Sequence, residues 1–139
     1  MYFPMIYILD AAALLNNESF RFEEGDRYYT TSGVLSEWRD VRSRILAQSG
    51  IAQGALIITD PCPVSIEITM EKAEQSGTRL GGNDISLIAL AAEFHSRREK
   101  FIVLTDDYSV QNVLKKIGVE FRGVMHRKIK GHRSFKGQE

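Results

Sequence analysis

Residues 101–118 read FIVLTDDYSVQNVLKKIG and contain the pattern that decides the fold. Residues 101–104 are apolar and favour a short strand buried on both faces, and Asp106 and Asp107 follow this strand within two residues. Residues 108–118 have the spacing of a helix, and Gly118 stands where helices commonly end. A strand, an acidic turn and a helix in this order predict one repeat of a mainly parallel sheet.

The same alternation continues outward from this stretch. We expect further strands over residues 5–9, 55–58 and 119–121, and helices over residues 11–15, 64–75 and 85–98. Asn83 or Asp84 is the expected N-cap of the helix over residues 85–98. Strands that alternate with helices predict an α/β fold, built as a three-layer α/β/α sandwich around a mainly parallel sheet.

Residues 28–31 are expected to lead into one long amphipathic helix. Thr31 or Ser32 could cap this helix, and Gly50 and Gly54 bracket its end. Its apolar positions recur at helical spacing and are Val34, Leu35, Trp38, Val41, Ile45 and Leu46.

Length, composition and charge set the protein class. The 139 residues are 43% hydrophobic and 26% charged, which fits one globular domain over residues 1–125 with a tail over residues 126–139. Residues 1–121 have 12 Lys/Arg and 17 Asp/Glu, a balance of −5, whereas residues 122–139 have 6 and 1, a balance of +5. The basic end is either a contact for a polyanion or a solvated terminus.

Several function classes are disfavoured. Cys62 is the only cysteine, so neither an intrachain disulfide nor a cysteine-based zinc site is expected. No apolar run approaches the roughly 18–20 residues of a membrane span, and the start lacks the basic region of a signal peptide. We therefore expect a cytoplasmic protein without a membrane contact.

Acidic residues mark a candidate site. Asp10 and the pair Asp106 and Asp107 follow two strands that should end at one edge of the sheet, where α/β proteins bind ligands. Asp84 stands at a helix start, and Glu37 lies beside a predicted apolar stripe. Each aspartate could simply cap a helix, and Glu37 could pair with an arginine between residues 39 and 44.

If these carboxylates converge, their mutual repulsion calls for a cation. A hard ion, Mg²⁺ or Mn²⁺, bound singly or as a pair, prefers such oxygen ligands. Such ions activate water for phosphodiester hydrolysis.

Four segments carry a resemblance to a known family. The segments ILDAAALL, SGVLSEWRD, GGNDISLIALAAEF and VLTDDYSVQNVLKKIG together resemble the PIN-domain fold over roughly residues 5–125. The last two look more narrowly like the Nob-type endonucleases, which mature the 3′ end of small-subunit ribosomal RNA. The string from Thr105 to Val113 is the most specific element of the resemblance.

The resemblance implies an endoribonuclease that depends on Mg²⁺ or Mn²⁺ and cleaves single-stranded RNA. By position, the four catalytic and metal-binding acids fall on Asp10, Glu37, Asp84 and Asp107. Asp106 is implied as a further metal ligand, and Thr105 as a residue beside the cleft that orients a carboxylate or water and contributes to substrate binding. The basic residues expected to grip RNA phosphates are Arg127, Lys128, Lys130 and Arg133.

The resemblance leaves alternatives open. Nob-type proteins carry a zinc ribbon after the nuclease domain, whereas this sequence has no paired cysteines, so it is either a trimmed form or from a lineage without the ribbon. A VapC-type toxin ribonuclease and a non-catalytic RNA-binding PIN module are the alternative functions. Both a monomer and a homodimer are compatible with the sequence.

Overall fold

The structure is a computed structural model that describes residues 3–15 and 17–126. Five strands form one sheet in the order β3-β2-β1-β4-β5, and all four strand pairs are parallel. The strands are β1 (Ile6–Leu9), β2 (Arg27–Thr30), β3 (Leu56–Ile58), β4 (Ile102–Leu104) and β5 (Phe121–Arg122). The helices are α1 (Ala12–Leu15), α2 (Ser32–Leu35), α3 (Val41–Ala52), α4 (Pro63–Gln75), α5 (Gly82–Ser96), α6 (Tyr108–Lys116) and the short 3₁₀ helix η1 (Val124–His126).

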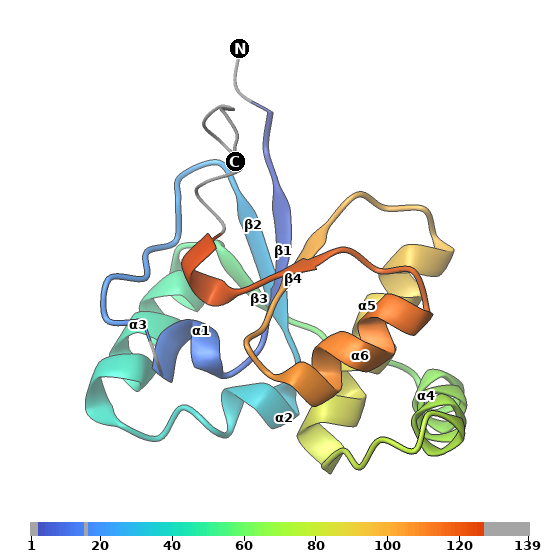
Figure 1. Cartoon of the computed structure of the whole chain (residues 1–139). Helices are drawn as coiled ribbons and strands as arrows, with labels where there is room; N and C mark the ends of the chain where they lie inside the picture. The colour runs from blue at the N-terminus through green and yellow to red at the C-terminus, as the bar shows by residue number, and fades with distance from the viewer. Residues whose placement is uncertain (1–2, 16, 127–139) are drawn as a thin grey trace.

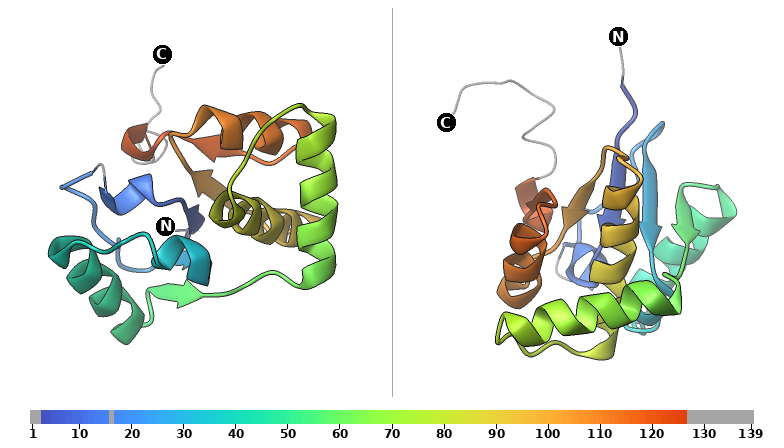
Figure 2. Two further views of the ribbon diagram at one scale, coloured as in Figure 1. Left: turned by 90° about the horizontal axis from the view of Figure 1, so that it is seen from below. Right: turned by 90° about the vertical axis from the view of Figure 1, so that its right-hand side faces the viewer.

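Helices cover both faces of the sheet (Figures 1 and 2). α1 and α3 lie on one face, α5 and α6 lie on the other, and α4 packs on the outside of α5. This is the expected three-layer α/β/α sandwich, and the prediction of a parallel sheet is confirmed. No helix among the described residues combines the length and apolarity that a membrane crossing requires.

The burial of β1 and β4 on both faces explains why these strands could be predicted from short apolar runs. Ile8, Leu9, Val103 and Leu104 are fully buried because helices pack on both faces of β1 and β4. Such strands read as continuous apolar runs and not as alternating ones. The buried side of α5, with Leu90 fully enclosed, completes the core on one face.

A separate strand at residues 27–30 is not expected from the sequence, and here the expectation is wrong. β2 pairs with both β1 and β3, and its Tyr28 is fully buried. The segment RYYT is only four residues long and alternates between exposed and buried positions. β2 ends at Thr30 and α2 begins at Ser32, so the polar ends of this segment are easily taken for the residues that precede a helix.

The single long helix expected after residue 31 is also wrong, because the chain forms two helices. α2 ends at Leu35, and Asp40 starts α3 anew by accepting the backbone N–H of Ser43 at 3.0 Å. The expected apolar stripe is therefore broken. Val41 is 71% exposed, whereas Trp38 in the linker is buried and its indole N–H donates to the Ala11 carbonyl at 2.9 Å.

The end of the next loop needs a smaller correction. The N-cap of α5 is Gly81, not Asn83 or Asp84, and both of these residues lie in the first turn of the helix. Their side chains are therefore free for other contacts. Gly118 does follow the end of α6 with φ +80°, as expected of a residue at the end of a helix.

Candidate active site

The candidate site lies where the chain direction across the sheet reverses. From β1 the chain proceeds to β2 and β3 on one side, and from β4 it proceeds to β5 on the other. The carboxyl ends of β1 and β4 are neighbours, with Leu9 paired to Leu104. Such a switch point is the usual ligand site of doubly wound sheets, and Asp10 and Thr105 are the residues that follow the two strands here.

Asp10 is buried, with 7% of its surface exposed, and both oxygens of its carboxylate accept hydrogen bonds. One carboxylate oxygen accepts the Ala11 backbone N–H at 2.8 Å and the other accepts the Thr105 hydroxyl at 2.6 Å. Burial raises the pKa of Asp10, the two hydrogen bonds lower it, and the charges of Asp107 and Glu37 raise it further. The net upward direction shows that repulsion and burial outweigh good hydrogen bonding.

Thr105 links two of the acids from a fully buried position. Its hydroxyl donates to Asp10 and accepts the Asp107 backbone N–H at 3.1 Å. The Gln111 side-chain amide donates to the Thr105 carbonyl at 2.8 Å and so ties this turn to α6. Thr105 has no exposed surface, and its hydroxyl is directed at the carboxylate of Asp10.

Asp84 reaches the same place from the first turn of α5. Burial raises its pKa to about 6, and the negative charges of Asp10, Asp107 and Glu37 add to the increase, while a hydrogen bond with the Gly81 backbone opposes it. Asp10 and Asp84 both respond to the charges of Asp107 and Glu37. Asp10 and Asp84 are thus each within electrostatic range of both Glu37 and Asp107, and the four acids come from four separate segments.

Glu37 lies in the turn between α2 and α3. Its Oε2 accepts the side-chain N–H of Asn83 at 2.7 Å, and among the described residues no arginine forms an ion pair with it. The alternative in which Glu37 pairs with Arg39, Arg42 or Arg44 is therefore not what the structure contains. Arg42 donates instead to the Leu14 carbonyl at 2.5 Å.

Asp106 and Asp107 play different parts. Asp107 is the N-cap of α6, where its Oδ1 accepts the Ser109 and Val110 backbone N–H groups at 2.8 and 3.3 Å. Asp106 turns toward the C-terminal segment, where its Oδ1 accepts the Val124 backbone N–H at 3.0 Å. Both side chains are exposed, but only Asp107 is among the charges that raise the pKa values of Asp10 and Asp84.

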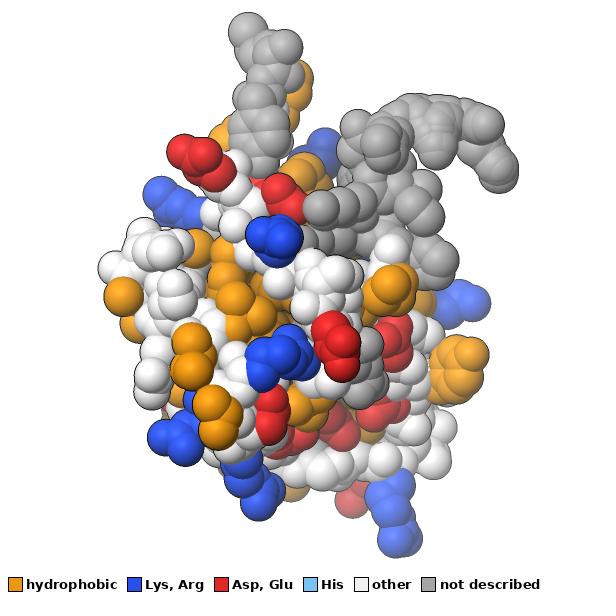
Figure 3. All heavy atoms as spheres, turned by 90° about the vertical axis from the view of Figure 1, so that its left-hand side faces the viewer, with side chains coloured by type: hydrophobic (Ala, Val, Ile, Leu, Met, Phe, Trp, Pro, Cys, Tyr) orange, Lys and Arg blue, Asp and Glu red, His pale blue; other side chains and the backbone are white. Residues whose placement is uncertain are grey.

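Acidic side chains gather on one face of the molecule, with basic side chains around them (Figure 3). Over residues 3–15 and 17–126, no three His, Cys, Asp or Glu side chains stand in an arrangement that could hold a metal ion as placed. The four basic residues expected to bind RNA, Arg127, Lys128, Lys130 and Arg133, lie outside the described residues.

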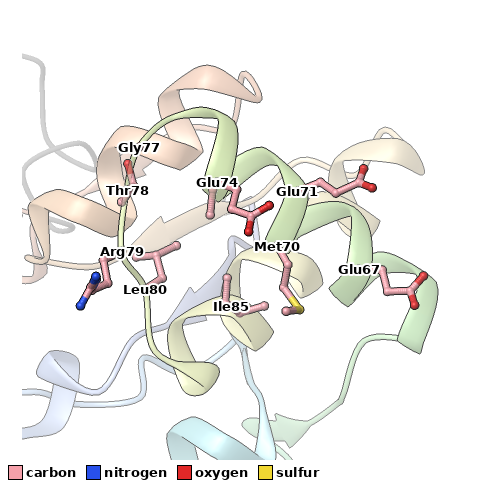
Figure 4. A pocket seen from close by; sticks show the side chains of 10 residues that line it. Glu67, Met70, Glu71, Glu74, Gly77, Thr78, Arg79, Leu80 and Ile85 are labelled. Carbon is pink, nitrogen blue, oxygen red and sulfur yellow. The ribbon is translucent and has the colours of Figure 1, made fainter.

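A hollow on the surface lies away from the candidate site. It has a volume of about 810 Å³, and its lining comes from α4 and the segment that leads into α5 (Figure 4). Glu67, Glu71 and Glu74 project from α4 along it, and Leu80 faces it from the opposite side. None of the four acids lines this hollow, so it is separate from the candidate site.

Sequence reasoning missed two contributors to the site. Asn83 was expected only as a helix cap, and Gln111 was noted only as part of a distinctive string. Both use a side-chain amide to fix a residue of the site, Glu37 in one case and Thr105 in the other. The one signal available was the adjacency of Asn83 to Asp84, which puts a polar amide beside an acid at a helix start.

The fold and the acidic centre define a class: doubly wound α/β domains with carboxylates at the sheet's switch point. Within that class, the chain belongs to the PIN-domain family, since residues 7–94 match the family described as the PIN domain of ribonuclease. The resemblance noted from the four sequence segments is confirmed.

Relatives in two groups support this assignment. The chain is 36% identical to endoribonuclease Nob1 of Methanothermobacter thermautotrophicus over 120 residues, which cover 85% of this chain and 68% of that protein. It is 34% identical to endoribonuclease Nob1 of Methanocaldococcus jannaschii, with 86% and 56% covered. It is 29% identical to ribonuclease VapC3 of Aeropyrum pernix, with 89% and 87% covered. The chain thus spans only 56–68% of the two Nob1 relatives.

A solved structure supports the fold alone. The crystal structure of VapBC2 from Rickettsia felis bound to a promoter DNA fragment superposes with a TM-score of 0.56 at 17% identity. The match covers 86% of this chain and 98% of that chain.

Proposed function

We propose that the protein is a metal-dependent endoribonuclease. The observation that carries this proposal is the set of four carboxylates, Asp10, Glu37, Asp84 and Asp107, which stand within electrostatic range at the switch point. The pKa values of Asp10 and Asp84 are raised because burial and the neighbouring negative charges disfavour the ionised carboxylates. Family membership and the Nob1 relatives support the same chemistry.

The donor set fits a hard divalent cation. All four side chains offer oxygen, which suits Mg²⁺ or Mn²⁺, and a cation would offset the repulsion that adds to the effect of burial on the pKa values of Asp10 and Asp84. Asp10, Glu37, Asp84 and Asp107 are the residues that would hold one or two such ions. A bound ion of this kind supplies an activated water and neutralises charge on the phosphate.

Asp106 and Thr105 have supporting roles in this proposal. The Thr105 hydroxyl donates to Asp10 and so favours the ionised carboxylate that a cation needs. Asp106 is placed outside the primary set of ligands because its charge is not among those that raise the pKa values of Asp10 and Asp84, and its Oδ1 faces the Val124 N–H. Its second oxygen remains available to a further ligand.

The substrate we propose is single-stranded RNA near the 3′ end of a small-subunit ribosomal RNA precursor. The support is that the two Nob1 relatives match 85–86% of this chain, together with the distinctive segment that starts at Thr105. The basic residues Arg127, Lys128, Lys130 and Arg133 would add sequence-independent contacts to phosphates. A cytoplasmic protein that works as a monomer or homodimer is part of this proposal.

The test is cleavage of a short single-stranded RNA that spans a small-subunit 3′ end. Wild-type protein should cut it with Mn²⁺ and not with EDTA. Glu37→Gln and Asp10→Asn should abolish cutting, whereas Glu67→Gln, a change at an exposed glutamate of α4, should leave it intact. Metal-independent cutting, or full activity of Asp10→Asn, would refute the proposal. Binding without cutting under any divalent ion would favour the non-catalytic RNA-binding module.

A toxin ribonuclease is the second candidate. The observation in its favour is that the chain is 29% identical to ribonuclease VapC3 of Aeropyrum pernix over 126 residues. Expression in a bacterial host separates the two candidates. Growth arrest that requires Asp10 favours the toxin, and unimpaired growth with cleavage of the ribosomal RNA end favours the processing enzyme.

A further inference from the structure

Glu37 is the one acid of the four that lies neither directly after a strand nor at a helix start. Its backbone is fixed, because its N–H donates to the Val34 carbonyl at 2.9 Å and the neighbouring Trp38 indole donates to Ala11. These bonds do not restrain the glutamate side chain, which has three rotatable bonds. A separate contact must therefore hold the carboxylate.

Asn83 provides this contact. Its side-chain Nδ2 donates to Glu37 Oε2 at 2.7 Å, which is short and typical of a bond to a charged acceptor. An ionised carboxylate only accepts hydrogen bonds, so the amide has to present its NH₂ group to Glu37 and turn its oxygen away. The oxygen Oδ1 then faces Gly33, where an added Cβ atom would collide with it.

A second set of hydrogen bonds joins α2, which precedes Glu37, to α5, which contains Asn83. The Thr31 side chain accepts the Val34 N–H at 3.2 Å and meets the Ser86 hydroxyl at 2.8 Å. Ser86 in turn donates to the Asn83 carbonyl at 2.7 Å. Because that bond uses the Ser86 proton, Thr31 is the donor in the Thr31–Ser86 pair. The start of α2 is thus fixed to the first turn of α5.

We infer, on the basis of the proposed function, that Asn83 is a positioning residue that aims Glu37 at the metal ion. Gly33 has no side chain, and this leaves room for the Asn83 amide beside α2. The consecutive residues Asn83 and Asp84, at the start of α5, have different roles in this inference. Asp84 joins the acidic centre, and Asn83 reaches sideways to hold an acid from another segment.

The test is a double-mutant cycle read by calorimetric titration of the full chain with Mn²⁺. Asn83→Ala should weaken Mn²⁺ binding about 10–100-fold, the usual effect of removing a partner of a metal ligand. In a Glu37→Ala background, Asn83→Ala should cause no further loss, because the residue that it positions is gone. Asn112→Ala, the same change at an exposed asparagine of α6, is the matched control and should bind Mn²⁺ as wild type does.

Gly33→Ala is an independent variant that keeps the amide and fills its space. It should weaken Mn²⁺ binding like Asn83→Ala, and the Gly33→Ala/Asn83→Ala pair should be no weaker than Asn83→Ala alone. Urea unfolding of each variant verifies that it is folded at the titration temperature.

Two outcomes would overturn the inference. If Asn83→Ala binds Mn²⁺ as tightly as wild type does, Asn83 does not act through Glu37. The same conclusion follows if Asn83→Ala weakens Mn²⁺ binding equally in the wild-type and Glu37→Ala backgrounds. If Glu37→Ala itself leaves Mn²⁺ affinity unchanged, the proposed metal site is wrong as well, and the positioning role falls with it. The behaviour of Glu37→Ala therefore distinguishes the two failures.

Discussion

Replacing Asp84 by Asn should stabilise the metal-free protein while it damages the metal site. The pKa of Asp84 rises from 3.8 to about 6 on folding, so the folded state penalises the ionised form. A rise of two units corresponds to about 3 kcal/mol for a fully enclosed group. Since Asp84 is only partly buried, solvent screening reduces the expected gain to about 1–2 kcal/mol.

The pH dependence gives the prediction its sign. Below the unfolded pKa of 3.8 the carboxyl is neutral in both states, so wild type and Asp84→Asn should be equally stable. Between pH 3.8 and about 6 the carboxyl ionises in the unfolded state before it does so in the folded state, so wild type loses stability, and the difference is complete above about pH 6. Above pH 7 the variant should melt about 3–8 °C higher in the absence of metal.

The assay is thermal unfolding by circular dichroism in EDTA at pH 4.0 and 7.5, repeated with Mn²⁺. Mn²⁺ should stabilise wild type more than the variant, because the variant lacks one ligand. Asp40→Asn is the control of opposite sign, since hydrogen bonds with Ser43 at the start of α3 lower the pKa of Asp40. A melting difference at pH 7.5 that is absent, or that is equally large at pH 4.0, would refute the argument.

Two further predictions concern the hydrogen bonds and the core. Thr105→Val removes the hydroxyl that orients buried Asp10, so RNA cleavage should fall about 10–100-fold in kcat while circular dichroism remains native, and an unchanged kcat would contradict this role. Leu90→Ala opens a cavity at a fully buried position and should cost about 2–5 kcal/mol in urea unfolding. Val41→Ser, at an exposed position, should stay within about 0.5 kcal/mol, and similar losses in the two variants would disprove the assigned packing.

The sequence predicted those features that depend on local chemistry. β1 and β4 are continuous apolar runs, and Asp10 and Asp107 follow them in the chain, so both the strands and the acids could be found without the fold. Asp84 could be found because it stands at the start of a strongly helical segment.

Features that depend on tertiary contacts could not be found in this way. β2 is a strand because β1 and β3 pair with it, and its own four residues carry little signal. The break between α2 and α3 follows from the burial of Trp38, whose indole bonds to Ala11, and no helical periodicity reports that bond. The contact between Asn83 and Glu37 joins residues 46 positions apart, so only the folded chain brings them together.

The position of β4 has a consequence for synthesis on the ribosome. β4 lies beside β1 at the middle of the sheet, although more than 90 residues separate the two strands along the chain. Until β4 emerges, β1 exposes an unpaired hydrogen-bonding edge that is prone to association with other chains. Asp107 also arrives only after β4, so a nascent fragment has an incomplete acidic centre. If the proposed function holds, the protein cannot cut RNA before nearly the whole domain has been made and folded.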